Sequence, residues 1–152
     1  MTLENLHEAE PQDPTFRNYN PNQAASFAQQ RQFYSPALYQ AIIDYHIANG
    51  GHFNNLLDVG CGSGAAIRSL AEYFSYAMGT DPGRELIFQA RNIGGQTKTG
   101  NLIQYEILSA EDLCLLQTIE HNSVDLLSVG MAVGGFLKNR IRLSLVNTSL
   151  LT

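Results

Sequence analysis

The stretch LLDVGCGSGAAI, residues 56–67, decides the fold, because an apolar run passes directly into three alternating glycines. Glycine loses more backbone entropy on folding than any other residue, and it has no side chain to pack. Its use at Gly60, Gly62 and Gly64, just after Asp58, indicates that something must approach the bare backbone. A strand, a tight glycine turn and a helix in this order place backbone N–H groups where a ligand binds.

Strand and helix patterns alternate on both sides of this stretch. Short apolar runs predict strands at 55–60, 76–81, 102–108 and 123–133. Helical spacing of apolar residues predicts helices at 65–74 and 82–93, with a turn and short helix at 109–119. Such alternation favours right-handed βαβ connections. The predicted fold class is α/β: a Rossmann-like, doubly wound, mostly parallel and incomplete sheet, of about four strands with an atypical C-terminal tail.

The same spacing predicts which side of each helix is buried. A helix that starts with Ser35 as N-cap and Pro36 at its first position, and ends at Gly50, carries a stripe of Leu38, Ala41, Ile42 and Tyr45. In the helix after the glycines the inner residues are Ile67, Leu70, Ala71 and Phe74. In the next helix they are Leu86, Ile87, Ala90 and Ile93.

Composition bounds the class of protein. The 152 residues, 44% apolar and 15% charged, fit one globular domain. The net charge of −5, without a basic stripe, predicts no nucleic-acid partner. Cys61 and Cys114 form neither a metal-binding pattern nor a disulfide framework, which is typical of reduced thiols in a cytoplasmic protein. The start has no leader pattern, and no run approaches the ~18 apolar residues of a membrane span, so no membrane partner is expected.

Three segments are predicted along the chain. Residues 1–23 are polar and contain three prolines, which predicts a disordered lead-in. Residues 24–133 hold the alternating elements. Residues 134–152 break the alternation and form the atypical tail, in which an alternating apolar pattern is consistent either with an antiparallel strand or with a frayed end.

The glycines alone leave alternatives open. Gly60, Gly62 and Ala65 also fit the dinucleotide-binding spacing, so a nicotinamide-dependent dehydrogenase domain is one alternative. Asp81 ends the second predicted strand, where its carboxylate can accept hydrogen bonds from both hydroxyls of a ribose. The plainer alternative makes Asp58 and Asp81 simple turn formers, and the glycines a simple helix entry.

Four segments together carry a family resemblance: LLDVGCGSG (56–64), MGTDPGRELIFQAR (78–91), YEILSAEDL (105–113) and VDLLSVGMA (124–132). The chain resembles the class I S-adenosylmethionine-dependent methyltransferases over roughly residues 27–133. The group it resembles most is the small-molecule type that includes trans-aconitate methyltransferases and their fungal relatives. The resemblance implies S-adenosyl-L-methionine as cofactor and methyl transfer to a small metabolite, for example a carboxylic acid.

The resemblance also implies roles for single residues around the methionine portion of the cofactor. Asp58 would order the loop near the amino group. The residues that would line this portion through their backbone are Gly60, Cys61, Gly62 and Gly64. Those that would lie below it and the transferred methyl are Gly130 and Met131. Those that would cover the carboxylate end are Arg31 and Tyr34. Plainer roles are a helix surface for Arg31 and Tyr34, a small loop residue for Cys61, and core packing for Met131 and Cys114.

Other residues would hold the nucleoside. Asp81 would bind the ribose hydroxyls, and Pro82 would lie near the adenine. The amide of Ala110 would face a ring nitrogen, with Ser109 or Glu111 near the exocyclic amine. Methyl transfer from a sulfonium mainly requires the reacting atoms to be held in line, so the resemblance implies no catalytic triad and no metal.

The sequence departs from the family after Val133. The family commonly continues with a His-Trp-Phe segment, a further helix and more strands, of which only Phe136 is recognisable here. We therefore expect a truncated or alternatively spliced product, with a small-molecule substrate as partner. An exposed edge on the fourth strand would favour self-association. The alternative is a catalytically inactive cofactor-binding or interaction fragment.

Overall fold

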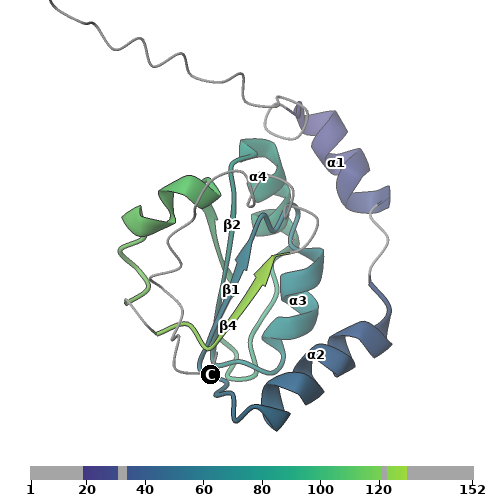
Figure 1. Ribbon diagram of the computed structural model, residues 1–152. Helices are drawn as coiled ribbons and strands as arrows, with labels where there is room; N and C mark the ends of the chain where they lie inside the picture. The colour runs from purple at the N-terminus through teal and green to yellow at the C-terminus, as the bar shows by residue number, and fades with distance from the viewer. Residues whose placement is uncertain (1–18, 31–33, 121–122, 130–152) are drawn as a thin grey trace, which may run out of the picture.

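Four parallel strands form the sheet of this protein, in a computed structural model that describes residues 19–30, 34–120 and 123–129 (Figure 1). The strands are β1 (Asn55–Val59), β2 (Tyr76–Asp81), β3 (Gln104–Ile107) and β4 (Leu126–Val129). They lie in the order β3-β2-β1-β4 and every pair of neighbours is parallel. The carboxyl ends of all four therefore meet at one edge, and the predicted α/β class with a parallel sheet is confirmed.

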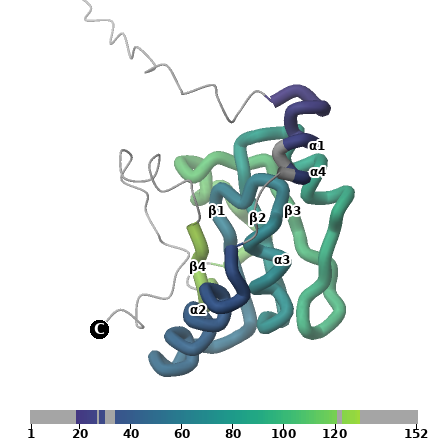
Figure 2. The backbone as a smooth tube through the Cα atoms, turned by 90° about the vertical axis from the view of Figure 1, so that its right-hand side faces the viewer, coloured from purple at the N-terminus to yellow at the C-terminus, as the bar shows by residue number. Residues whose placement is uncertain are grey.

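Helices cover the two faces of the sheet unequally (Figures 1 and 2). On one face lie α2 (Pro36–Ala48), α3 (Ala65–Ala71) and α4 (Arg84–Ile93). The short 3₁₀ helix η1 (Ala110–Leu115) packs on the other face. A further helix, α1 (Pro21–Gln30), packs against α4. Because α3 and α4 connect successive parallel strands, each begins at the edge where the strands end.

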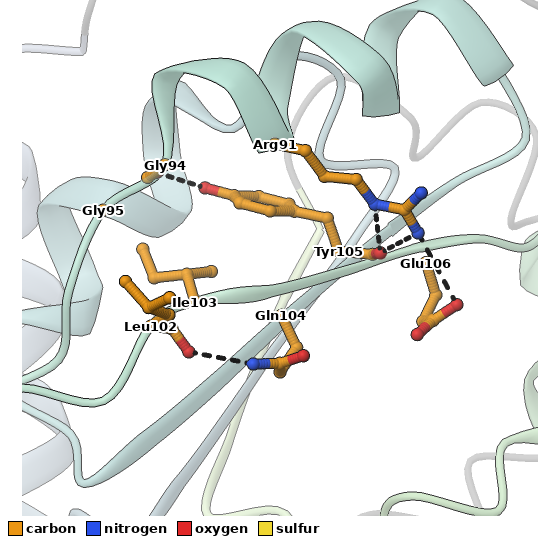
Figure 3. A pocket seen from close by; sticks show the side chains of 8 residues that line it. All are labelled: Arg91, Gly94, Gly95, Leu102, Ile103, Gln104, Tyr105 and Glu106. Atoms are coloured by element: carbon orange, nitrogen blue, oxygen red, sulfur yellow. Dashed lines mark hydrogen bonds and ion pairs between the residues drawn. The ribbon is translucent and has the colours of Figure 1, made fainter.

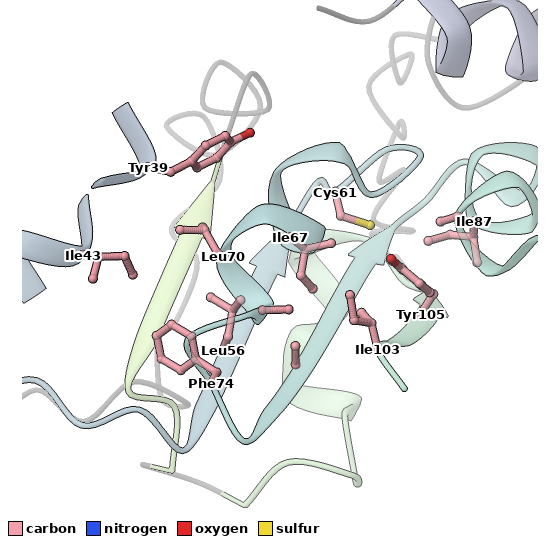
Figure 4. Packing of buried hydrophobic residues seen from close by; sticks show 13 residues of the cluster. Tyr39, Ile43, Leu56, Cys61, Ile67, Leu70, Phe74, Ile87, Ile103 and Tyr105 are labelled. Carbon is pink, nitrogen blue, oxygen red and sulfur yellow. The ribbon is translucent and has the colours of Figure 1, made fainter. Parts of the chain in front are cut away.

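The main core lies between the sheet and the helices α2, α3 and α4, as Figure 4 shows. Phe74, which follows α3, is fully buried, and its ring centroid lies 5.1 Å from that of Phe53. The buried residues of α3 and its continuation are those predicted from spacing: Ile67, Leu70, Ala71 and Phe74. Burial of this stripe, at about 25 cal/mol per Å² of apolar surface, is what positions α3 behind the glycine loop.

The spacing was misleading for α2. Its predicted stripe is largely exposed: Leu38 retains 43% and Tyr45 73% of their accessible surface. The buried face instead carries Tyr39, Ile43 and His46, one position further along the helix. The His46 ring packs edge-on against Phe53 at 4.9 Å, and its Nε2 lies 2.7 Å from the His52 carbonyl oxygen. The spacing of apolar residues did not reveal the buried face of α2, because one of its three buried residues, His46, is polar.

Helix ends account for the remaining differences. Ile93, predicted to face inward, is the last residue of α4 and is half exposed. Ser35 precedes α2 in extended conformation and Pro36 is its first residue, as predicted, although the Ser35 side chain makes no capping bond. The helix α1 begins at Pro21, so residues 21–23 of the predicted lead-in are helical. The rest of that lead-in up to residue 18, and the tail at 134–152, lie outside the described residues.

β4 is fastened to β1 at the amino ends of both strands. Asp125 Oδ2 accepts hydrogen bonds from the backbone N–H groups of Asn54 (2.8 Å) and Asn55 (2.9 Å). The Asn55 side-chain amide donates to the Ser123 carbonyl at 2.9 Å. These bonds fix the register that sets Asp58 opposite Ser128 at the other end of the pair.

At the opposite margin of the sheet, an arginine covers the edge of β3. Arg91 of α4 donates from Nε (3.1 Å) and from Nη2 (2.6 Å) to the carbonyl oxygen of Tyr105 (Figure 3). A guanidinium suits this arrangement because it presents several N–H donors in one plane. No helix within the described ranges has the length and apolar character needed to cross a membrane.

Candidate functional site

The loop between β1 and α3 is held by backbone hydrogen bonds to the neighbouring strand. Gly60, Gly62 and Gly64 have φ of +70°, +57° and +87°, a region that side chains disfavour. The N–H groups of Gly60 (2.8 Å) and Cys61 (2.9 Å) both donate to the carbonyl of Thr80 on β2. The Gly64 N–H donates back to the Cys61 carbonyl at 3.0 Å, which closes the turn. The loop thus has a fixed backbone path.

Asp81 joins this loop to the next one. Its carboxylate is buried at the end of β2; Oδ2 accepts the Gly62 N–H at 2.9 Å, and Oδ1 accepts the Gly83 N–H at 2.8 Å. Hydrogen bonds that end on a carboxylate are stronger than those between neutral groups. The Asp81 side chain therefore ties the loop that follows β1 to the loop that follows β2, at the carboxyl ends of both strands. Pro82, half-buried, lies between the tied residues.

Asp58 lies beside this loop on β1. Its carboxylate is buried, and Oδ1 accepts a hydrogen bond from the Ser128 hydroxyl of β4 at 2.8 Å. Cys61 is also buried, and its sulfur is so near β2 that a side chain at Gly79 would come within 2.9 Å of it. Cys61 therefore acts as a small packing residue, whereas Cys114, predicted to be core, is exposed on η1.

The segment after β3 runs alongside the end of β2. The Leu108 N–H donates to the backbone carbonyl of Asp81 at 3.0 Å, so Ser109 follows directly after a residue bonded to Asp81. Ser109 is extended, and its hydroxyl donates to Asp112 Oδ2 at 2.9 Å. Ala110 is half-buried and Glu111 is exposed, at the start of η1. The segment that holds the three predicted nucleoside residues therefore begins beside the Asp81 end of β2.

The remaining predicted site residues are less well placed. Tyr34 is half-buried before α2, and its ring meets that of Tyr39 edge-on at 6.2 Å. Tyr34 packs against the main hydrophobic core, to which Tyr39 belongs. Arg31, Gly130 and Met131 lie outside the described residues. Among the residues that the structure describes, no group of histidine, cysteine and acidic side chains could hold a metal ion.

Sequence reasoning missed two residues that shape the site. Ser128 holds the Asp58 carboxylate, and its signal was a hydroxyl inside the otherwise apolar run of residues 126–129. Thr80 supplies the carbonyl on which the loop starts, a role that leaves no trace in a sequence because any residue has a carbonyl. Its side chain is fully buried on the opposite face of the sheet, and its hydroxyl has no hydrogen-bond partner within the described part of the chain.

The glycine loop, Asp58 and the Asp81 link all fall inside one family match. The methyltransferase domain family matches residues 57–142, which is more than half of the chain. The chain belongs to this methyltransferase family. Together with the fold, the match identifies a class I S-adenosylmethionine-dependent methyltransferase domain rather than a dehydrogenase domain. No curated protein sequence matches the chain.

Solved structures agree with this methyltransferase assignment. One is a protein assigned as a type II methyltransferase from Anaeromyxobacter dehalogenans, with 27% identity and a TM-score of 0.56; the match covers 76% of this chain and 44% of that one. A methyltransferase from Clostridium acetobutylicum (18% identity, TM-score 0.56; 74% and 42% covered) shares the fold. A protein assigned as a methyltransferase from Methanococcus maripaludis also shares the fold, with 18% identity and a TM-score of 0.54. That match covers 76% of this chain and 52% of the other. The chain thus spans about half the length of these structures.

The described residues of the methyltransferase domain fit an adenosyl cofactor. An ionised carboxylate offers about four acceptor positions, so Asp81 can accept hydroxyl donors in addition to two backbone N–H groups. The loop carries no side chain at Gly60, Gly62 and Gly64, so a ligand can approach its backbone closely there. Asp81 would hold the ribose, and the Gly60–Gly64 backbone would line the methionine portion.

A shallow pocket of about 360 Å³ lies away from this loop, along the β3 edge of the methyltransferase domain (Figure 3). Arg91, Gly94, Gln104 and Glu106 line it, with the ring of Tyr105 on its inner side. Arg91 and Glu106 are within 3.9 Å of each other, but both side chains are about half exposed, so solvent screens the pair. The pocket is a surface feature of the edge and not part of the cofactor site.

Tyr105 gives the methyltransferase domain a pH dependence at the alkaline end. Burial raises the pKa of its hydroxyl, and the neighbouring Arg68 guanidinium only partly opposes this. A phenol with a raised pKa in the folded state stabilises the fold below the ordinary tyrosine pKa of about 10, and this contribution is lost as the pH rises through the folded value. We expect the difference between wild-type and Tyr105→Phe absorbance titrations at 295 nm to show a phenolate forming above pH 10. A difference centred at or below that pH would contradict it.

Proposed function

We propose that this chain binds S-adenosyl-L-methionine at the carboxyl end of β1–β3, in an enzyme that methylates a small carboxylic-acid metabolite. The observation that carries the proposal is the Asp81 carboxylate, which fixes the Gly62 amide at 2.9 Å while standing at the end of the neighbouring strand. One side chain thereby joins the part of the site expected to hold the methionine portion with the part expected to hold the ribose. When bound, the cofactor supplies an activated methyl group on a sulfonium.

In this proposal the chain binds and orients the cofactor and does little proton chemistry. Asp58, held by Ser128, sets a negative charge beside the loop, where the amino group of the methionine portion would lie. The Ser109–Glu111 segment would receive the adenine, next to Pro82. Arg31, Tyr34, Gly130 and Met131 keep the roles that the resemblance implies, around the methionine portion.

An acceptor that is already ionised at neutral pH suits this arrangement. The two histidines that the structure describes, His46 and His52, lie where α2 leads into β1, at the edge opposite the glycine loop. A carboxylate oxygen needs no general base to attack a methyl group, whereas a phenol or an amine does. This chemistry agrees with the resemblance to trans-aconitate methyltransferases. The net charge of −5 and the free thiols agree with a cytoplasmic enzyme that binds no nucleic acid.

A second candidate function is cofactor binding without turnover. The observation that favours it is length, because the chain spans 42% to 52% of the solved methyltransferases named above. Residues that contact the acceptor in a whole enzyme can lie in the part of those structures that this chain does not span. In this candidate function the chain would bind the cofactor and associate with other chains rather than methylate.

Calorimetric titration of the purified 152-residue chain separates these functions. We expect S-adenosylhomocysteine and S-adenosylmethionine to bind with micromolar dissociation constants, about −8 kcal/mol, and NAD to show no binding at the same concentrations. A panel of small carboxylic acids with the labelled methyl donor then tests turnover.

Each outcome decides one point. Methyl transfer to an acid would establish the enzyme, whereas cofactor binding with no transfer to any acid would favour the second candidate. Binding of NAD without S-adenosylhomocysteine would overturn both.

A further inference from the structure

Beneath the glycine loop, one side chain of α3 reaches back to the loop backbone. Arg68 donates from Nη1 to the Ser63 carbonyl oxygen at 2.7 Å. Ser63 is almost completely buried, so this carbonyl is a hidden acceptor rather than a solvated one. A charged donor on a buried carbonyl gives a short and strong hydrogen bond. The peptide between Ser63 and Gly64 is thereby held in one orientation.

Tyr105 of β3 supports the same arginine from the other side. Its ring lies on the helix-covered face of the sheet, together with Cys61 (Figure 4). Its hydroxyl donates to the Gly94 carbonyl at 3.0 Å, where α4 ends, and it lies beside the Arg68 guanidinium, since a Cβ at Gly64 would come within 2.8 Å of both groups. The hydroxyl is therefore anchored to the end of α4 and packs beside the residue that holds Ser63.

Two glycines leave the room that this arrangement needs. A Cβ at Gly64 would lie 2.7 Å from Arg68 Nη1 and 2.8 Å from the Tyr105 hydroxyl. A Cβ at Gly95 would lie 2.9 Å from Arg68 Cγ. The aliphatic stem of Arg68 therefore runs past Gly95, and its guanidinium fills the space under Gly64. Gly64 therefore has two roles: it adopts the positive φ of the turn, and it leaves room for the Arg68 and Tyr105 side chains beneath the loop.

We propose that Arg68 and Tyr105 are positioning residues, which hold the glycine loop in the conformation that accepts the cofactor. The inference rests on the proposed function, since it assumes that this loop binds the methionine portion. Neither residue needs to touch the cofactor. Arg68 fixes the Ser63–Gly64 peptide, and Tyr105 fixes the guanidinium of Arg68. A preorganised backbone binds a ligand more tightly because less conformational entropy is lost on binding.

The test compares the affinity of variants of the 152-residue chain for S-adenosylhomocysteine. We expect Arg68→Met to weaken binding about tenfold and Arg68→Lys, which keeps one charged donor, to recover a part of the loss. Tyr105→Phe removes one hydroxyl and is expected to weaken binding about threefold. Arg91→Met is the matched control, because Arg91 also donates to a backbone carbonyl, that of Tyr105, but at the outer edge of β3.

Two readouts separate positioning from general stability. Melting temperature is expected to fall in both Arg68→Met and Arg91→Met, whereas of these two variants only Arg68→Met loses affinity. Hydrogen exchange at the amides of residues 62–64, in the ligand-free chain, is expected to be faster in Arg68→Met and Tyr105→Phe than in Arg91→Met. Wild-type affinity in both Arg68→Met and Tyr105→Phe would overturn the inference and leave the proposed function intact. Absence of binding by the wild-type chain would overturn the proposed function instead.

Discussion

Replacing Asp81 with asparagine is expected to weaken binding of S-adenosylhomocysteine about 100-fold. The carboxylate accepts the Gly62 and Gly83 N–H groups, one on each oxygen, and in the proposed function it also accepts the ribose hydroxyls. An amide nitrogen cannot accept, so one buried N–H loses its partner and at least one hydroxyl contact is lost. Hydrogen bonds to a charged group contribute roughly 1.5–3 kcal/mol each, and about 1.4 kcal/mol corresponds to a tenfold change in affinity.

Asp125 offers a matched control for this prediction. Its carboxylate also accepts two backbone N–H bonds, from Asn54 and Asn55, but at the amino ends of β1 and β4. We expect Asp125→Asn to lower the free energy of unfolding by about 1–2 kcal/mol and to leave the affinity unchanged. Urea unfolding and calorimetry on both variants provide the comparison. Equal affinities of Asp81→Asn and wild type would remove the ribose role from Asp81.

Replacing Gly64 with alanine is expected to destabilise the chain by about 2–5 kcal/mol. A left-handed φ of +87° costs a residue with a Cβ roughly 1–2 kcal/mol. The Cβ would also lie 2.7 Å from Arg68 Nη1 and 2.8 Å from the Tyr105 hydroxyl, and overpacking of this kind typically costs about 1–3 kcal/mol. Cofactor affinity should fall with stability, because the loop and its support must separate.

Gly100 isolates the two contributions. Its φ of +82° is nearly the same, but no heavy atom lies within 4 Å of where its Cβ would be. Gly100→Ala should therefore cost only the left-handed term, about 1–2 kcal/mol, with unchanged affinity. The difference between the two variants in urea unfolding measures the contact under the glycine loop. If Gly64→Ala and Gly100→Ala lower the free energy of unfolding equally, the contact under the glycine loop contributes nothing to stability.

The sequence predicted the parallel sheet because local signals agree over residues 55–93. Apolar runs, glycine turns and helical spacing each favour the same elements there, so β2 was predicted at its observed bounds, Tyr76–Asp81. The α2 stripe was mispredicted because His46 is buried by packing against Phe53 and Phe74, which lie elsewhere in the chain. Burial of a polar residue is a property of tertiary contacts, and periodicity cannot detect it.

The candidate site was predicted in the same uneven way. Glycines with positive φ and an aspartate ending a strand are visible in a sequence, so Gly60–Gly64 and Asp81 could be named. The bond from Ser128 to Asp58 joins residues 70 positions apart, and it requires the register of β1 with β4. The support by Arg68 and Tyr105 similarly joins α3 to β3. Long-range pairs of this kind depend on topology, which a single sequence does not encode locally.

The guanidinium of Arg91 on the outer carbonyl of Tyr105 has a consequence for how molecules meet in concentrated solution. An incoming chain that extends the sheet at β3 must first displace two N–H donors from that oxygen. It must also desolvate the half-exposed guanidinium of Arg91, which costs free energy. Arg91, a residue of helix α4, therefore opposes the addition of even a first molecule to the β3 edge, and with it the growth of open-ended fibres there.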